Sequence, residues 1–317
     1  MKRIGLLTRD CAGINAAIRA IVRTAAGRRT EVLGVLRGYE GLMAGSVIPL
    51  DRRSVSSIIN LGGTILKSAR SEGFYAPEGR RRAAAKVRAL GLEGLIVVGG
   101  NGSLTGAHLL AVEHGVPLVG LPATIDNDVS GVEMTLGADT AVNVALDALD
   151  KIRDTATSLE RIFVVEVMGR ACGWIAMQVA LAGGCEEVLL PERGFELETM
   201  VREIREGAAR GKLSWIVIVA EGKARAHDIA AEITRTTGLE TRIAVLGHLQ
   251  RGGRPTSYDR ILAARLGHAA VEALLGGQTD VLVHLKGEVI ETLSLAAAIE
   301  PQCRELSADY SLLKLLS

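Results

Sequence analysis

Aromatic residues and an excess of charge of either sign are the first things that the sequence lacks. Phe, Trp and Tyr together make up 3% of the 317 residues, too few for a platform on which nucleic-acid bases could stack. Lys and Arg number 37 against 36 Asp and Glu, which leaves a formal net charge of +1 at pH 7. No overall field therefore attracts nucleic acid or an anionic membrane, and any site for an anion must be local.

Cysteine motifs and long apolar runs are missing as well. Cys11, Cys172, Cys185 and Cys303 are widely spaced and form no C-x-x-C pair, so neither a zinc knuckle nor a disulfide framework is indicated. No uninterrupted apolar segment reaches membrane-spanning length, and Met1 to Thr8 has a strand pattern rather than that of a signal peptide. A protein of the reducing cytoplasm is expected.

What is present is a regular alternation of strand-like and helical runs in a chain that is 48% hydrophobic. Leu95 to Val98 is typical of a strand buried on both faces of a parallel sheet, and Ser257 to Leu275 is a long amphipathic helix. Val55 to Asn60 is predicted to be a short helix that ends at the following glycines. Such alternation, without Pro/Ser-rich linkers, predicts an α/β fold with parallel sheets.

The segment from Pro122 to Asp128, P-A-T-I-D-N-D, is the strongest candidate for chemistry. It places two carboxylates, Asp126 and Asp128, directly after the apolar run Val116 to Leu121. Ligands of parallel sheets bind beyond the carboxyl ends of the strands, where paired acids suit proton abstraction or metal binding. Taken alone, the same residues are also typical of a turn or a helix cap.

Two glycine-bearing junctions between a strand and a helix could hold phosphate. They read T-R-D-C-A-G-I-N from Thr8 and V-V-G-G-N-G-S from Val97, and neither is a known nucleotide-binding fingerprint. The second is favoured because its three glycines let the backbone approach an anion closely. A tight turn that merely starts a helix is the alternative.

Arginines recur near the ends of predicted strands and in loops. Each one alone is most simply a solvated side chain, but the group favours a phosphorylated ligand, because a guanidinium matches phosphate oxygens. The positions are Arg70, Arg161, Arg170 and Arg242, with His248 and Arg251 in G-H-L-Q-R-G-G.

Together these runs resemble the bacterial type of 6-phosphofructokinase. The matching runs, in family order from Arg3 to about Gly276, are I-N-A-A-I-R, G-G-T-I-L-K-S-A-R, T-I-D-N-D, V-V-E-V-M-G-R-A-C-G, A-G-G-C-E, V-L-G-H-L-Q-R-G-G and Y-D-R-I-L-A. The resemblance implies two similar three-layer αβα lobes with largely parallel sheets and an active site in the cleft between them. The nucleotide-binding lobe would hold residues 1–137 and 252–300, and the sugar-phosphate lobe residues 138–251 and 301–317.

The resemblance also implies a reaction, the glycolytic transfer of a phosphoryl group from ATP to the 1-hydroxyl of fructose 6-phosphate, with Mg²⁺ as cofactor. Asp126 would be the general base, and the other catalytic residues would be Thr124, Asp128 and Arg170. Nucleotide-binding residues would be Arg70, Gly100, Asn101, Gly102 and Ser103, with Asn101 and Asp128 at the metal. Sugar-phosphate residues would be Arg161, Met168, Gly169, Glu221, Arg242, His248 and Arg251, of which Arg161 and Arg242 would come from a neighbouring subunit of a tetramer.

The phosphoryl donor and an effector site follow from the same resemblance. Gly102 and Ala123 are small where pyrophosphate-using relatives carry Asp and Lys, which favours ATP. An effector site for a nucleoside diphosphate or phosphoenolpyruvate would comprise Arg19, Arg23, Arg52, Arg153, Glu186, Arg210 and Lys212.

Two departures from the family pattern fall on the donor side. The first loop, R-D-C-A-G, is shorter than the usual G-G-D-[AC]-P-G and lacks its paired glycines and proline. Asn101 stands where the family has an Asp associated with magnesium, so the metal should bind less tightly. The alternative to an active kinase is therefore a weakly active or inactive regulatory paralogue that binds sugar phosphate or effector, or an enzyme with another donor.

Overall fold

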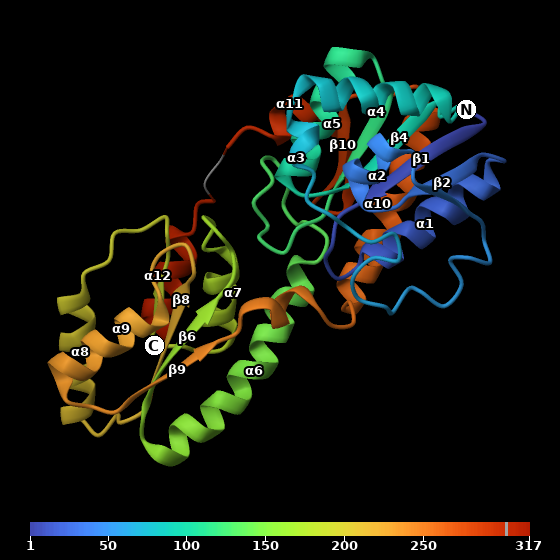
Figure 1. Cartoon of the computed structure of the whole chain (residues 1–317). Coiled ribbons are helices and arrows are strands. Elements are labelled where there is room, and N and C mark those ends of the chain that lie inside the picture. Colours follow the sequence, from blue (N-terminus) through green and yellow to red (C-terminus); the bar gives the residue numbers. More distant parts are fainter. Residues whose placement is uncertain (302–303) are drawn as a thin grey trace. The chain divides into compact units, whose positions relative to one another are not determined.

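The computed structural model describes residues 1–301 and 304–317, which form two compact units. Of the described residues, unit 1 contains 1–140 and 251–301, and unit 2 contains 141–250 and 304–317. Each unit is a sheet covered by helices (Figure 1). The expectation of an α/β fold with mostly parallel sheets is confirmed. Cys303 lies outside the described residues.

The sheet of unit 1 is parallel in its centre and antiparallel at its two edges. Its order is β11 (Val289–Ser294), β10 (Val281–Lys286), β5 (Leu118–Pro122), β4 (Gly94–Gly99), β1 (Arg3–Thr8), β2 (Glu31–Val35) and β3 (Val47–Leu50). Only β3 and β11 run against their neighbours. All residues of β4 and β5 are buried, as expected for strands with helices on both faces. The carboxyl ends of β1, β4 and β5 consequently meet at one edge of the sheet.

The helices of unit 1 pack on this sheet and on one another. They are α1 (Ile14–Gly27), α2 (Gly38–Ala44), α3 (Glu72–Tyr75), α4 (Pro77–Ala89), α5 (Asn101–His114), α10 (Ser257–Leu275) and α11 (Leu295–Ala298). The most extensive helix pair joins α1 to α10. A Cβ on Gly267 would lie 2.8 Å from Ala20 Cβ, so glycine is what lets the two helices approach.

A buried carboxylate fixes the first turn of α10 to the start of α6 (Ala138–Leu159), the long helix whose later residues belong to unit 2. Asp259 is 0% exposed and accepts hydrogen bonds from Gly137 N (2.8 Å), Thr140 N (2.9 Å) and Thr140 Oγ1 (2.5 Å). Burial is the main cause that raises the pKa of Asp259, and the three hydrogen bonds oppose it. The carboxylate therefore holds the origin of α6 in unit 1.

Unit 2 is built on a parallel sheet of four strands within its described residues. The order is β7 (Glu187–Leu189), β8 (Trp215–Ala220), β6 (Ile162–Val167) and β9 (Thr241–Val245). The associated helices are the main part of α6, α7 (Trp174–Ala182), α8 (Leu197–Ala209), α9 (Ala226–Thr237) and α12 (Ser307–Leu316), and the 3₁₀ helix η1 (Gly247–Arg251) follows β9. Apolar side chains of α8 and α9 pack on β6 and β8 in one cluster.

One predicted helix is wrong. Residues 55–60 form turns rather than a helix. Asp51 Oδ1 accepts from Arg53 N (3.0 Å) and Ser54 N (2.7 Å), and Ser57 has a φ of 60°. Local side-chain bonds and a left-handed residue compete with helical hydrogen bonds, which explains the difference.

None of the helices in residues 1–301 and 304–317 combines the length and apolar character that a membrane span needs. The segment after Gly276, beyond the runs that carry the resemblance, contains the β10–β11 hairpin, α11 and α12.

Candidate active site

The T-I-D-N-D segment leaves β5 and is locked by a second stretch of chain. Asn127 is fully buried, and its Oδ1 accepts from Thr135 N (2.9 Å). The hydroxyl of Thr135 donates to Thr124 O (2.7 Å), and Thr124 Oγ1 accepts from Asp126 N (3.2 Å). The next helix, α6, begins only at Ala138, so the segment is not a helix cap. This lock fixes Asp126, which is 2% exposed.

The glycine loop after β4 lies directly beside this acidic segment. A Cβ on Gly100 would lie 3.1 Å from Thr124 Cβ, whereas one on Gly102 would meet nothing within 4 Å. Asn101 Nδ2 donates to Asp128 Oδ2 (2.9 Å) and to Asp128 O (3.1 Å). The side chain of Asn101 therefore ties the glycine loop to Asp128.

The end of β1 joins the same edge through Arg9. Its backbone N donates to Val98 O (2.9 Å), and a Cβ on Gly99 would lie 2.9 Å from Arg9 Cγ. The guanidinium Nη1 donates to Ala69 O (2.5 Å), the carbonyl that precedes the exposed Arg70. Arg9, from the shortened loop, thus connects the end of β1 to the end of β4 and to the backbone before Arg70.

The segment 61–70 is held at its start by Asn15 of α1. Asn15 Nδ2 donates to Leu61 O (3.2 Å) and Gly62 O (3.0 Å), and its Oδ1 accepts from Ile65 N (2.9 Å). An irregular segment is therefore held in one conformation by Arg9, from the loop after β1, and by Asn15 of α1.

In unit 2, carboxylate and amide side chains hold the loop that carries Arg170. Glu221 Oε1 accepts from Gly169 N (3.2 Å) and Arg170 N (2.9 Å), and Gln250 Oε1 accepts from Met168 N (2.8 Å). Gly169 has a φ of 146° and Arg170 one of 52°. The structure thus brings together Met168, Gly169, Arg170 and Glu221, four residues singled out from the sequence.

The remaining sugar-phosphate candidates lie on β9 and near it. Arg161 Nε lies 2.8 Å from Glu240 Oε2, and Arg242 also pairs with Glu240. His248 is exposed on η1, whereas Arg251, the last residue of η1, belongs to unit 1. The structure groups Arg161 with Arg242.

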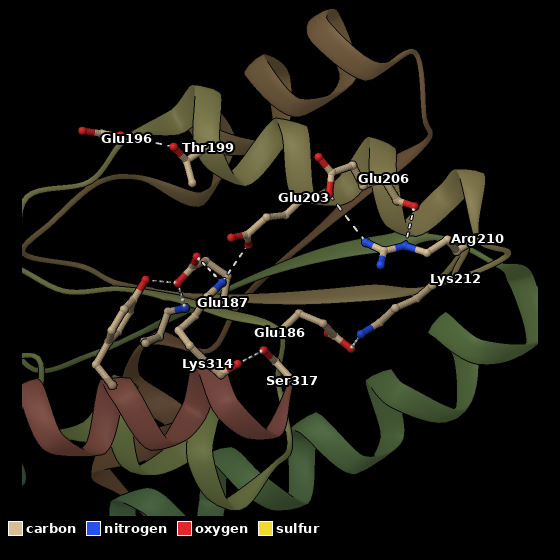
Figure 2. Close-up of polar contacts among 12 residues, drawn as sticks. Glu186, Glu187, Glu196, Thr199, Glu203, Glu206, Arg210, Lys212, Lys314 and Ser317 are labelled. Carbon is tan, nitrogen blue, oxygen red and sulfur yellow. Dashed lines mark hydrogen bonds and ion pairs between the residues drawn. The ribbon is translucent and has the colours of Figure 1, made fainter.

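The predicted effector residues divide between the units. In unit 2, Glu186, Arg210 and Lys212 lie near the start of β7 and the end of α8 (Figure 2), and Arg153 is on α6. Lys212 Nζ lies 3.2 Å from Glu186 Oε1 and 4.7 Å from the centre of the Trp215 ring. Arg210 pairs with Glu206, and Arg153 donates to the carbonyls of Gly183 and Gly184. Arg19, Arg23 and Arg52 are in unit 1.

Several residues that shape these sites have no sequence motif of their own. Glu187, next to Glu186, accepts from Tyr310 Oη (3.0 Å) and from Lys314 Nζ (3.2 Å) of α12, and Lys314 also donates to Glu203 (2.7 Å) (Figure 2). In unit 1, Thr135 holds the T-I-D-N-D segment and Arg9 holds the backbone before Arg70. Of Glu187, Thr135 and Arg9, the last lies in a segment that the sequence analysis identifies, the glycine-bearing junction after Thr8.

Residues 1–301 and 304–317 contain no group of three His, Cys, Asp or Glu side chains that could hold a metal by themselves. The acidic segment can supply a base and one or two oxygen ligands, and the glycine loop with the start of α5 can receive an anion.

Comparison with known proteins agrees with this arrangement. The Phosphofructokinase family model matches residues 3–274. The ATP-dependent 6-phosphofructokinase 1 of Thermus thermophilus is 50% identical over 319 residues, covering 99% of this chain and 98% of the relative. An ATP-dependent 6-phosphofructokinase of Thermotoga neapolitana is 46% identical over 97% of this chain and 99% of its own.

Solved structures give the same result. Phosphofructokinase from Saccharomyces cerevisiae aligns with a TM-score of 0.89 and 35% identity over 95% of this chain and 45% of the yeast chain. A pyrophosphate-dependent phosphofructokinase from Marinobacter aquaeolei, at 23% identity and a TM-score of 0.86, shares the fold and covers 97% of this chain and 86% of its own. With matches of this extent, the chain belongs to the phosphofructokinase family.

Proposed function

We propose that the chain is an ATP-dependent 6-phosphofructokinase, which transfers the terminal phosphoryl group of ATP to the 1-hydroxyl of fructose 6-phosphate. The observation that carries the proposal is the buried Asp126, fixed at the end of β5 by the Asn127–Thr135 lock and beside the glycine loop. The products would be fructose 1,6-bisphosphate and ADP, as in glycolysis. The cytoplasm is the proposed location.

Asp126 would act as the general base. As the oxygen of the sugar's 1-hydroxyl bonds to phosphorus, its proton passes to the Asp126 carboxylate, and the bond between phosphorus and the bridging oxygen of ADP breaks. Thr124 bonds the Asp126 backbone and would help to orient the carboxylate. Arg170 would offset negative charge on the transferring group.

The sugar phosphate would be bound by residues of unit 2 and by Arg251 of unit 1. Met168, Gly169 and Glu221 would contact the sugar, and the bonds from Glu221 to the backbone of Gly169 and Arg170 support a preformed loop. His248 and Arg251 would bind the 6-phosphate. Arg161 and Arg242 would reach the 6-phosphate of a neighbouring subunit in a homotetramer, which would require them to leave Glu240.

The nucleotide would be bound at the glycine loop. Arg70, Gly100, Asn101, Gly102 and Ser103 are the proposed contacts. The open space at Gly102 supports ATP over pyrophosphate as donor, because the side chain of pyrophosphate-using relatives is absent there.

A magnesium ion fits the residues present, provided that the donor's phosphates supply most of its ligands. Mg²⁺ usually binds through one or two carboxylates plus substrate phosphates and waters. Asp128 supplies one carboxylate, and the Asn101 amide bonded to it adds an oxygen but no charge. The ion would neutralise charge on the phosphoryl group.

We expect Asn101→Asp to lower the Mg²⁺ concentration for half-maximal activity roughly 3- to 10-fold, because it adds a negative ligand beside Asp128. In EDTA the same variant should have a lower Tm than the parent, since two carboxylates then face each other. Asn60→Asp, in unit 1 but in neither loop, is the charge-matched control. An unchanged magnesium requirement would remove position 101 from the metal site.

We also propose allosteric control by a nucleoside diphosphate or phosphoenolpyruvate, bound by Arg19, Arg23, Arg52, Arg153, Glu186, Arg210 and Lys212. The Lys212–Glu186 pair supports this, because an anionic ligand could replace the carboxylate as partner of the lysine.

The purified chain should turn over fructose 6-phosphate with ATP and Mg²⁺ in an assay coupled to aldolase and NADH, and should show little turnover with pyrophosphate. The competing possibility is a regulatory paralogue, motivated by the shortened loop and Asn101. No turnover with either donor, despite measurable binding of fructose 6-phosphate, would establish the paralogue instead.

A further inference from the structure

The shortened loop after β1 brings a side chain to the edge of the sheet where the donor is proposed to bind. Arg9 is the first residue of that loop, it is half-buried, and its backbone N is bonded to Val98 O at the end of β4. Its stem lies against Gly99, which has no side chain to obstruct it. The start of α5, which no side chain caps, follows immediately.

The guanidinium is anchored but not neutralised. Nη1 donates to Ala69 O (2.5 Å), which leaves four of the five N–H groups for other acceptors. In the described part of the chain, Arg9 takes part in no ion pair with a carboxylate. A half-buried, anchored positive charge is therefore directed to this edge.

Tyr39 and Ala69 show where the guanidinium of Arg9 lies. Tyr39 donates to Ser103 O (2.6 Å) in the first turn of α5. Burial raises the pKa of this tyrosine, and the positive charge of the nearby Arg9 opposes that rise. Arg9 thus lies near the first turn of α5, and its bond to Ala69 also fixes the backbone before Arg70. Both proposed phosphate-binding elements, the helix start and Arg70, adjoin it.

We propose that Arg9 binds phosphoryl oxygens of the nucleotide donor directly and replaces, with a charged fork, backbone N–H donors that a longer glycine loop would supply. The inference rests on the proposed function and deepens it, because it makes donor affinity depend on one side chain. A guanidinium binds phosphate through paired N–H groups, so the contact is to the phosphates and not to the base.

The test compares Arg9→Gln and Arg9→Lys with the parent, and Arg82→Gln, an exposed arginine of α4 in the same unit, is the matched control. We expect Arg9→Gln to raise the KM for ATP roughly 10- to 100-fold, the usual effect of losing charge-assisted bonds, and to raise that for GTP by the same factor. The KM for fructose 6-phosphate should change by less than about twofold. Arg9→Lys keeps the charge without the fork and should raise the KM for ATP by about 3- to 10-fold.

A structural role for the Arg9–Ala69 bond alone would give another pattern. Arg9→Gln would then lower the Tm without ligand and change the KM for both substrates alike, which would overturn the proposal, as would a KM for ATP equal to that of Arg82→Gln. If Arg9→Gln does not fold, Arg9→Lys decides, and a parental KM for ATP in that variant counts against the proposal.

Binding separates this inference from the proposed function. ATP should raise the Tm of the parent and raise that of Arg9→Gln much less. A parent that binds ATP without turnover contradicts the proposed function alone, and the loss of the Tm gain in Arg9→Gln then still supports the role of Arg9. A parent that neither binds nor uses ATP overturns both.

Discussion

Asp126→Asn is expected to lower kcat about 10²- to 10⁴-fold, the range for removal of a positioned general base. The amide has almost the same shape but cannot accept the proton of the attacking hydroxyl. The Asn127–Thr135 lock does not involve the Asp126 side chain, so the loop should keep its conformation. The KM for fructose 6-phosphate should therefore stay near the parental value, which initial-rate measurements at saturating ATP will show.

Asp228→Asn, an exposed residue in the first turn of α9, makes the same chemical change outside the site. It should leave kcat unchanged. Thermal unfolding of both variants checks that the protein remains folded. If Asp126→Asn keeps the parental kcat, Asp126 is not the base.

Asp259→Ala is expected to destabilise unit 1 by about 3–5 kcal/mol, because it leaves three buried donors without an acceptor. Those donors are Gly137 N and both the N and the Oγ1 of Thr140. Urea unfolding followed by far-UV circular dichroism measures the loss. Both tryptophans, Trp174 and Trp215, lie in unit 2, so the midpoint from their fluorescence should move less.

Glu78→Ala is the control for Asp259→Ala. Glu78 is also in the first turn of a helix of unit 1, but its ion pair with Arg81 is exposed, so its removal should leave the urea midpoint almost unchanged. A similar loss in both variants would show that the buried bonds of Asp259 contribute little. The stability of Asp259→Asn should lie between that of the parent and that of Asp259→Ala, since the amide oxygen of asparagine can still accept a hydrogen bond.

The sequence predicts those parts of the site that follow from local pattern. Buried β-branched runs identify the strands, and parallel strands place their carboxyl ends at one edge, so T-I-D-N-D and the glycine loop could be expected to meet. The structure joins them through Asn101 and Asp128.

Contacts between distant residues could not be predicted in this way. Asp259 meets Gly137 across 122 residues, and Arg9 meets Ala69 across 60. Neither contact has a periodic or compositional signal, since each depends on how elements pack. The helix predicted over residues 55–60 was wrong for a local reason, because the hydrogen bonds that the Asp51 carboxylate accepts from Arg53 N and Ser54 N outweigh a weak helical pattern.

The interleaving of the two units along the chain has a consequence for how the protein folds during synthesis. Unit 1 cannot pair α1 with α10 until the ribosome has made both sides of the Arg28–Glu272 contact, which spans 244 residues. Unit 2 cannot pair Glu187 with its cation until Lys314, 127 residues later, has been made. Both units must therefore stay incomplete while most of the chain is translated, and long-range closures of this kind favour slow folding with exposed apolar surface.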